Sequence, residues 1–196
     1  VGFMILRMGL KFSYEAIREL VDTALSDEEV ERIRVTLRGT SGVLGLHELR
    51  TRRMAHQVLA DAHIQVDARI SVSEGHRIAE MARARVLATH PEVLDVLVHV
   101  DAEEDSDAGW RAVEIKLPER EALLANLRAL MGEELPRFEK TLLHYLGNRV
   151  EAEVFLPLEI CFDPDHVVRI ERRLAEHMTG DPYFSAVSIN CRIAPK

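Results

Sequence analysis

The sequence predicts an α+β fold with two tandem ferredoxin-like units (αββαβ and βαββαβ), each with helices on one face of a small sheet. Segments with the helical period of 3.6 residues are interleaved with segments in which apolar and polar residues alternate, as in strands. The order of these segments in residues 26–105 recurs in residues 110–196, after an acidic linker at residues 101–109. An internal duplication with a period of about 90 residues is the simplest account.

The first unit is expected to follow the order α-β-β-α-β. Ser26 and the three acids after it are a typical helix start, and this helix should end before Gly39. Ser73 should open the second helix, which ends near Pro91. A basic turn at residues 50–53 should join the first two strands. The expected strands are residues 43–50, 57–70 and 93–101.

The second unit is expected to follow the order β-α-β-β-α-β, with the same pattern of apolar residues. Its expected strands are residues 111–117, 135–146, 149–162 and 184–193, and its expected helices are residues 118–131 and 163–178.

The N-terminal segment, residues 1–25, combines an apolar start with a helical period over residues 12–25. Two interpretations fit residues 1–6. They are either a buried or ragged N-terminus or the end of a membrane helix whose cytosolic side is marked by Arg7 and Lys11. No run of about 18 apolar residues exists, so this chain is not expected to span a bilayer.

Composition and net charge limit the kinds of molecule that the chain is expected to bind. The chain has 196 residues and a net charge of −8, which disfavours binding to nucleic acid and favours cations. Cys161 and Cys191 lie far apart and form no CxxC motif, so neither a disulfide framework nor a thiolate zinc site is suggested. They are expected to be free, buried cysteines of a reducing compartment.

The histidines carry the functional prediction. On the strand that begins at residue 57, His63 lies on the face opposite the apolar residues, and on residues 93–101 His99 and Asp101 share the polar face. These two strands are commonly neighbours in a ferredoxin-like order, so the three side chains could converge. His47, on the first strand, and His76, near the start of the second helix, complete the candidate set. Imidazoles with a carboxylate suit zinc, cobalt, nickel or cadmium, and Asp101 could bridge two ions.

The second unit serves as an internal control for this site. Asn190 stands where the first unit has His99, Arg192 where it has Asp101, and either Phe155 or Val154 where it has His63. The fold alone therefore does not require the polar cluster. A single histidine on a strand is usually a surface residue, and the remaining histidines are interpreted as surface or capping groups. They are His56, His90, His144, His166 and His177.

Several motifs, taken together, resemble the cation diffusion facilitator family over about residues 1–105. They are GLHELRTRR at residues 45–53, AHIQV at 62–66, SVSEGHRIAE at 71–80 and VHVD at 98–101, with LRMG at 6–9 and YEAIRELVD at 14–22 upstream.

The resemblance implies a homodimeric membrane transporter that expels divalent cations, usually zinc, in exchange for protons. Residues 1–25 would be the end of its last membrane helix and a linker, and residues 26–105 its cytoplasmic metal-binding and dimerisation domain. His47, His63, His76, His99 and Asp101 would stand at the family's cytoplasmic metal positions. The ion would be zinc or another divalent transition metal such as cobalt, cadmium, nickel, manganese or iron.

The sequence also departs from the family pattern. Ala102 and Ala55 replace a common proline and a common glycine, and residues 110–196 form a second unit that most members lack. The family's transport site lies within the membrane, outside this chain.

Three hypotheses follow for the chain itself. The first is regulatory metal binding, which acid should weaken because a ligating imidazole must be unprotonated. The second is a metal-independent dimerisation module in which the histidines are incidental. The third, a zinc-dependent hydrolase, is disfavoured because no recognisable spacing places a base or nucleophile beside the cluster. The chain is therefore predicted not to be an enzyme.

Overall fold

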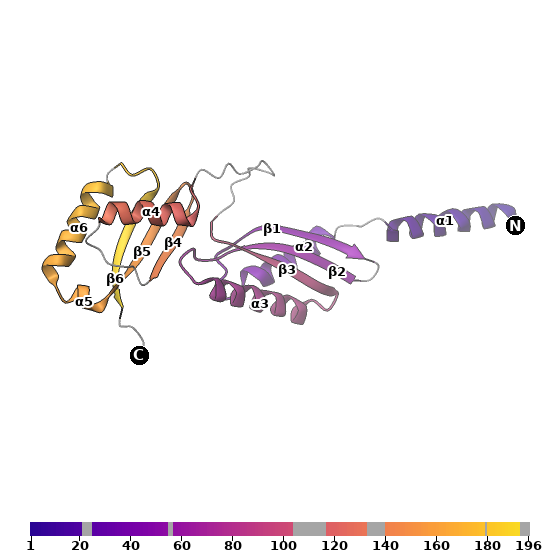
Figure 1. Cartoon of the computed structure of the whole chain (residues 1–196). Helices are drawn as coiled ribbons and strands as arrows, with labels where there is room; N and C mark the ends of the chain where they lie inside the picture. The colour runs from indigo at the N-terminus through magenta and orange to yellow at the C-terminus, as the bar shows by residue number, and fades with distance from the viewer. Residues whose placement is uncertain (21–24, 55–56, 104–116, 133–139, 179, 193–196) are drawn as a thin grey trace. The chain divides into compact units, whose positions relative to one another are not determined.

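The computed structural model describes residues 1–196 except 21–24, 55–56, 104–116, 133–139, 179 and 193–196. The chain forms two compact units, Val1–Asp107 and Ala108–Lys196. Each unit contains a three-stranded sheet, in the order β1-β2-β3 in the first and β4-β5-β6 in the second (Figure 1). The predicted α+β class is confirmed.

In the first unit the middle strand is β2 (Gln57–Gln65), which pairs antiparallel with β1 (Gly45–Met54) and parallel with β3 (Val93–Asp101). The parallel connection runs through α3 (Val72–Thr89), and α2 (Asp27–Arg38) precedes β1. One hydrophobic core joins buried residues of both helices to one face of the sheet. The opposite face of the sheet carries the polar side chains.

The N-terminus of α2 has the signal that the sequence predicts. Ser26 accepts a hydrogen bond from the Glu29 backbone, and the Glu29 carboxylate accepts one from the Ser26 backbone, which makes a capping box. Ile33 and Leu37, four residues apart, are buried against the sheet. For α3 the capping residue is Ser71 rather than Ser73, so this helix begins earlier than predicted.

In the second unit β5 (Arg149–Pro157) pairs antiparallel with β4 (Lys140–Leu146) and parallel with β6 (Phe184–Arg192). Helices α4 (Arg120–Met131) and α6 (Pro164–Met178) contribute to a separate hydrophobic core. The strand predicted at residues 111–117 falls outside the described residues except for its last position.

The two sheets match in register. The parallel pair of each unit has a register irregularity at the same place, between Val58 and Leu59 in β2 and between Val150 and Glu151 in β5. Counting from these points, His63 corresponds to Phe155, and not to Val154. The shared irregularity supports the internal duplication.

The ends of three strands differ from prediction. The predicted basic turn at residues 50–53 belongs to β1, where Arg50 pairs with Asp61 and Arg53 with Val58. Charged residues on the solvent face of a strand do not interrupt its ladder, and this explains the error. The strand predicted over residues 149–162 ends at Pro157, and the short helix α5 (Leu158–Cys161) follows. The strand predicted to run to residue 70 ends at Gln65.

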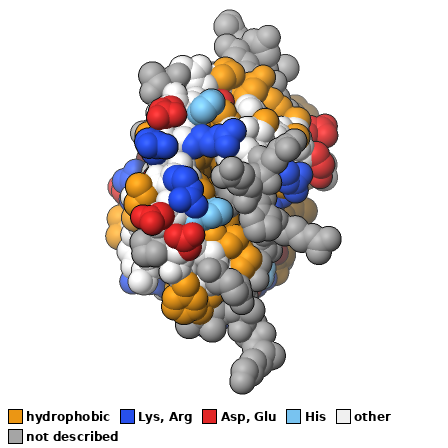
Figure 2. Space-filling view, turned by 60° about the vertical axis from the view of Figure 1, so that its left-hand side comes forward, with side chains coloured by type: hydrophobic (Ala, Val, Ile, Leu, Met, Phe, Trp, Pro, Cys, Tyr) orange, Lys and Arg blue, Asp and Glu red, His pale blue; other side chains and the backbone are white. Residues whose placement is uncertain are grey.

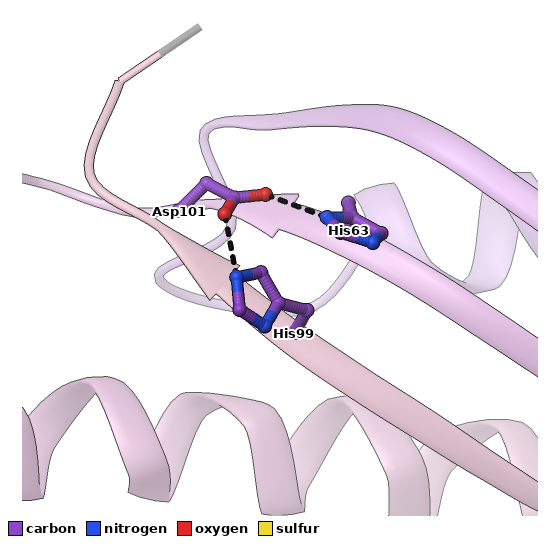
Figure 3. A group of neighbouring side chains, drawn as sticks. All are labelled: His63, His99 and Asp101. Carbon is purple, nitrogen blue, oxygen red and sulfur yellow. Dashed lines mark hydrogen bonds and ion pairs between the residues drawn. The ribbon is translucent and has the colours of Figure 1, made fainter. Parts of the chain in front are cut away.

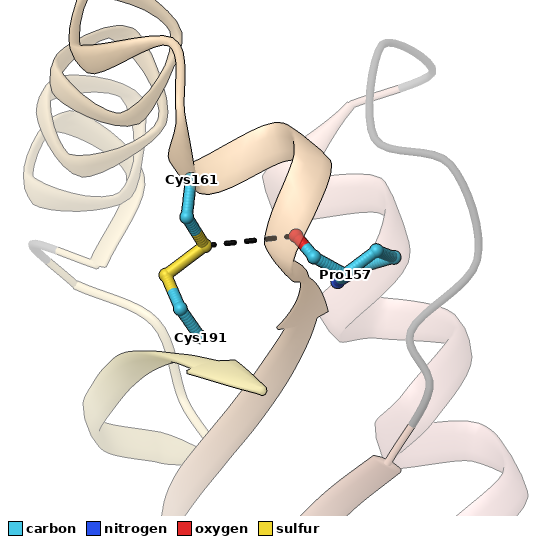
Figure 4. The surroundings of a disulfide bond; sticks show 3 residues. All are labelled: Pro157, Cys161 and Cys191. Atoms are coloured by element: carbon cyan, nitrogen blue, oxygen red, sulfur yellow. Dashed lines mark hydrogen bonds between the residues drawn. A yellow bond between two sulfur atoms is a disulfide. The ribbon is translucent and has the colours of Figure 1, made fainter. Parts of the chain in front are cut away.

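The prediction of free cysteines is wrong. Cys161 and Cys191 form a disulfide that joins α5 to β6 (Figure 4). The Cys161 sulfur also lies 3.6 Å from the carbonyl oxygen of Pro157. Cys191 pairs in register with Leu156 at the end of β5, and the chain turns back through α5 directly after it. The parallel pairing therefore brings together two cysteines that are 30 residues apart.

The N-terminal helix α1 (Gly2–Leu20) starts well before the predicted residue 12. Its side chains are exposed through residue 17, including Phe3 and Ile5, so the interpretation of residues 1–6 as a buried segment is wrong. Among the described helices, none combines the length and apolar character that crossing a membrane requires.

Candidate metal centre

Two parallel strands bring the predicted site residues together. His63 on β2 is the register partner of His99 on β3, and Gln65 is the partner of Asp101. The alternation along β2 is clear, because Ala62 and Ile64 are buried in the core while His63 between them is not. The side chains of His63, His99 and Asp101 therefore share the face of the sheet that lies away from α2 and α3.

The Asp101 carboxylate lies between the two imidazoles (Figure 3). His63 Nδ1 is 3.1 Å from Oδ2 of Asp101, and His99 Nε2 is 3.0 Å from Oδ1. The ring centroids of the two histidines are 4.7 Å apart. Each residue offers a ligand atom within 4.8 Å of the others, and within the described part of the chain this is the one such group of three.

Burial is uneven across this cluster. The Asp101 side chain is 12% exposed, whereas that of His99 is 62% exposed. A buried carboxylate needs hydrogen bonds or a cation, and here each oxygen has an imidazole N–H to accept. In the tautomers that make these contacts, His63 Nε2 and His99 Nδ1 keep their lone pairs. A neutral imidazole in either of these tautomers therefore has one nitrogen with a lone pair for a cation.

His47 lies next to this cluster on a β-bulge. Leu46 pairs with Ile64 and Glu48 pairs with His63, so His47 is the extra residue in β1. Leu46 and Leu49 both pack in the core, which leaves His47 and Glu48 for the opposite face. His47 Nε2 is buried and has no hydrogen-bond partner among the described residues. A buried imidazole nitrogen without a partner fits a ligand position.

His76 lies elsewhere. It is exposed in the first turns of α3, the helix that packs on the core face of the sheet. Its neighbour Gly75 is buried, and a Cβ there would lie 3.4 Å from the Val100 side chain, in ordinary van der Waals contact. The structure therefore brings together three of the five predicted residues, places His47 at the bulge of the adjoining strand but outside this group, and leaves His76 apart.

Glu48 is a candidate that the sequence analysis missed. It is the register partner of His63, and its carboxylate pairs with Arg50 at 2.7 Å. Simple alternation along β1 does not place it there, because the bulge shifts the face of every later residue by one position. The sequence around Glu48 contains no feature that predicts the bulge.

Among the described residues of the second unit, there is no counterpart of this cluster. Lys140 pairs with Phe155 where the first unit pairs Glu48 with His63, and the Lys140 ammonium lies 5.7 Å from the Phe155 ring centroid. Asn190 is the parallel partner of Phe155. A lysine beside an aromatic ring disfavours a second cation.

Two of the remaining histidines are less exposed than a surface residue. His90 is the C-cap of α3, as a capping role would require, but it is buried and lies 2.8 Å from the Thr36 hydroxyl. His144 lies 2.9 Å from the Glu153 carboxylate. His56 lies outside the described residues.

Comparison with known proteins shows which protein family the first unit resembles. Residues 25–103 match the sequence model of the family described as "Cation efflux protein, cytoplasmic domain". This stretch contains α2, α3 and the whole β1-β2-β3 sheet with its histidine cluster. Residues 25–103 belong to the cation efflux cytoplasmic domains. The resemblance to the cation diffusion facilitator family is thereby confirmed for the first unit.

Curated relatives of this cation efflux domain are longer proteins. Metal tolerance protein C1 of Arabidopsis thaliana is 28% identical over 200 residues, which cover 96% of this chain and 42% of that protein. Metal tolerance protein 2 of Oryza sativa subsp. japonica is 36% identical over 51% of this chain and 26% of its own length. The cation-efflux pump FieF of Yersinia pestis is 35% identical over 52% of this chain and 33% of its own length. The chain thus spans less than half of each of these relatives.

The alignment with metal tolerance protein C1 extends through the second unit, whereas the other two cover about half of the chain. Among solved structures, a cadmium form of a MamM CTD variant is 26% identical and covers 41% of this chain and all of that chain, with a TM-score of 0.40.

Proposed function

We propose that the first unit is a regulatory metal-binding domain of a divalent-cation efflux transporter, and that His63, His99 and Asp101 hold the ion. The observation that carries this proposal is the mostly buried Asp101 carboxylate, which lies within 3.1 Å of both imidazoles. Two imidazoles and a carboxylate are a typical donor set for zinc. Cobalt, nickel, cadmium, manganese and iron are the alternatives to zinc.

Binding requires only a small rearrangement of the cluster. Atoms that share one tetrahedral zinc ion lie roughly 3.4 Å apart, given zinc–ligand distances of about 2.1 Å. The three donors lie within 4.8 Å of one another before any ion is bound. His47, whose Nε2 is buried and unpaired, is the proposed fourth ligand. His76 would serve a separate, weaker site, because it is exposed on α3.

Bound cations would act through charge. The chain carries a net charge of −8, so two copies repel one another. An ion in the cluster neutralises Asp101 and fixes β2 to β3, and in a homodimer it favours the arrangement in which the two domains are close. In the whole protein this would couple the metal level in the cytoplasm to cation export in exchange for protons across the cell membrane. The role proposed for this chain is binding, not catalysis.

The test is a zinc titration by calorimetry of the full chain and of a His99→Ala, Asp101→Ala double variant. We expect the variant to lose about 100-fold or more in affinity, since two of three ligands are gone. A His144→Ala, Glu153→Ala variant is the matched control, because it removes a histidine–carboxylate pair from the second unit. Equal zinc binding by the wild type and the His99/Asp101 variant rejects the assignment.

A second candidate function is a dimerisation module that does not depend on metal. The outer face of β3 favours it, because Leu97 is exposed next to His99 on the same face. Sedimentation with and without a chelator separates the two candidates. A dimer of equal stability in both conditions, with no zinc bound, supports the second, and a dimer that forms only with metal supports the first.

A further inference from the structure

A second cluster of ionisable side chains lies in the second unit, along α6. A pocket of about 350 Å³ opens there beside Met131 at the end of α4. Figure 2 shows basic side chains and histidines gathered on this side of the protein. The basic residues that line the pocket are His166, Arg169, Arg172, Arg173 and His177. Three of these five residues are arginines, in a chain whose net charge is −8.

The spacing of these residues places most of them on one stripe of the helix. His166, Arg169, Arg173 and His177 follow one another at intervals of three or four residues. At 1.5 Å per residue the stripe is about 16 Å long. Met131 and the buried Ile170 give the pocket an apolar wall. The stripe therefore places two arginines and two histidines beside an apolar wall.

The carboxylates at this site do not balance the arginines. Among the described residues, Glu176 is the one acidic residue that lines the pocket, and it lies 3.9 Å from Arg172. Asp163 lies 3.9 Å from Arg169, and Asp163 also accepts a hydrogen bond from the backbone of His166. Both arginine contacts are too long for strong hydrogen bonds and leave donors available.

Arg173 is the residue at the centre of the pocket. Its guanidinium lies against Gly132, where a Cβ would collide with it. Within the described part of the chain its guanidinium makes no hydrogen bond or ion pair. In the first unit, by contrast, Arg85 reaches the end of α2 and donates to the Gly39 carbonyl. Among the described residues, the Arg173 guanidinium therefore lies against Gly132 with donors available for a ligand.

We propose that this pocket binds an anion that carries phosphate groups. The guanidinium of arginine presents paired N–H donors that match two phosphate oxygens. Arg169 and Arg173 are one helical turn apart, so the two could hold one phosphate between them or two linked phosphates along the stripe. Soluble phosphate compounds and phospholipid headgroups share this chemistry.

The competing explanation is an ion pair within the chain. Glu133 and Glu134 follow Gly132 in the sequence and lie outside the described residues. Either carboxylate would occupy Arg173 and close the pocket to an external anion. The experiment therefore includes variants of the α6 arginines and variants of these two glutamates.

The probes are inorganic pyrophosphate, titrated into the full chain by calorimetry, and phosphatidylcholine vesicles with and without phosphatidylglycerol, used in a flotation assay. We expect binding in at least one arm, weakened about tenfold or more by Arg169→Gln with Arg173→Gln. A matched Arg32→Gln, Arg38→Gln variant removes two exposed charges from α2 and should bind within about twofold of the wild type.

The pyrophosphate arm identifies a soluble ligand and the vesicle arm a lipid headgroup. Circular dichroism of each variant separates loss of binding from loss of fold. The proposal is overturned if the wild type binds neither probe, or if the α2 variant loses as much affinity as the α6 variant. Binding that appears only after Glu133→Gln with Glu134→Gln also overturns it, because an internal ion pair then occupies the arginines.

Discussion

At the scale of single residues, Asp101 is the residue that links the two histidines of the candidate metal centre. Its carboxylate is largely buried, and its two oxygens accept from one imidazole each. In the second unit Phe155 and Asn190 stand where the first unit has His63 and His99. The two sheets have the same order, so the histidine–carboxylate cluster depends on a few side chains on one face and not on the fold.

Glu29 gives a prediction at this scale. Hydrogen bonds from the Ser26 backbone and side chain, followed by the bond from Arg53, lower the pKa of Glu29 from 4.5 to about 2. A carboxyl with a lowered pKa stabilises the fold fully above its unfolded pKa, and this contribution disappears as the pH falls toward about 2.

We therefore expect Glu29→Gln to destabilise the first unit at neutral pH and to flatten the loss of stability between pH 4.5 and about 2. Urea unfolding at a series of pH values measures this. Glu28→Gln removes a carboxylate from the same helical turn without breaking the capping box, and it should leave the pH profile nearly unchanged. Identical profiles for Glu29→Gln and the wild type would contradict the prediction.

At the scale of elements, alternation along the strands and spacing along the helices carry most of the information. The core face of β2 and the buried stripe of α2 follow directly from the positions of the apolar residues. The bulge in β1 does not, because it arises from pairing with β2. The end of β1 is also set by pairing, since Arg50 and Arg52 are exposed and Arg53 bonds to Glu29 of α2.

Ile33 tests the packing of α2 on the sheet. It is fully buried, so Ile33→Ala should lower the free energy of unfolding of the first unit by about 2–5 kcal/mol. Hydrogen exchange of α2 and β2 amides reports the loss within that unit. Val35 is exposed on the same helix, and Val35→Ala should change stability by less than about 0.5 kcal/mol. Comparable losses for the two variants would contradict this view of α2.

At the scale of the whole molecule, the two units have similar topology and separate hydrophobic cores. Different side-chain interactions link the elements of each unit. The first has a histidine–carboxylate cluster between its parallel strands, and the second has a disulfide. The disulfide joins β6 to the helix that follows β5, and it closes a loop of 30 residues. A cross-link of this kind stabilises chiefly by restricting the unfolded chain.

Replacing both cysteines, Cys161→Ser with Cys191→Ser, should therefore destabilise the second unit by about 2–4 kcal/mol. The first unit has its own core, so its zinc affinity should not change. Hydrogen exchange resolved by segment, with and without a reducing agent, measures the first effect, and calorimetry the second. If the reductant changes nothing in the wild type, the disulfide does not contribute to stability.

The sequence by itself determined the α+β class, the duplication, the polar faces of β2 and β3, and the family of the first unit. These properties depend on local periodicity and on motifs, which are visible along one strand or helix at a time. The contact of His63, His99 and Asp101, the place of Glu48 at the bulge, the pairing of Cys161 with Cys191 and the cationic pocket on α6 were decided by the tertiary structure. Each of these depends on the register between strands or on packing between helices, and both are set by contacts between residues far apart in the chain.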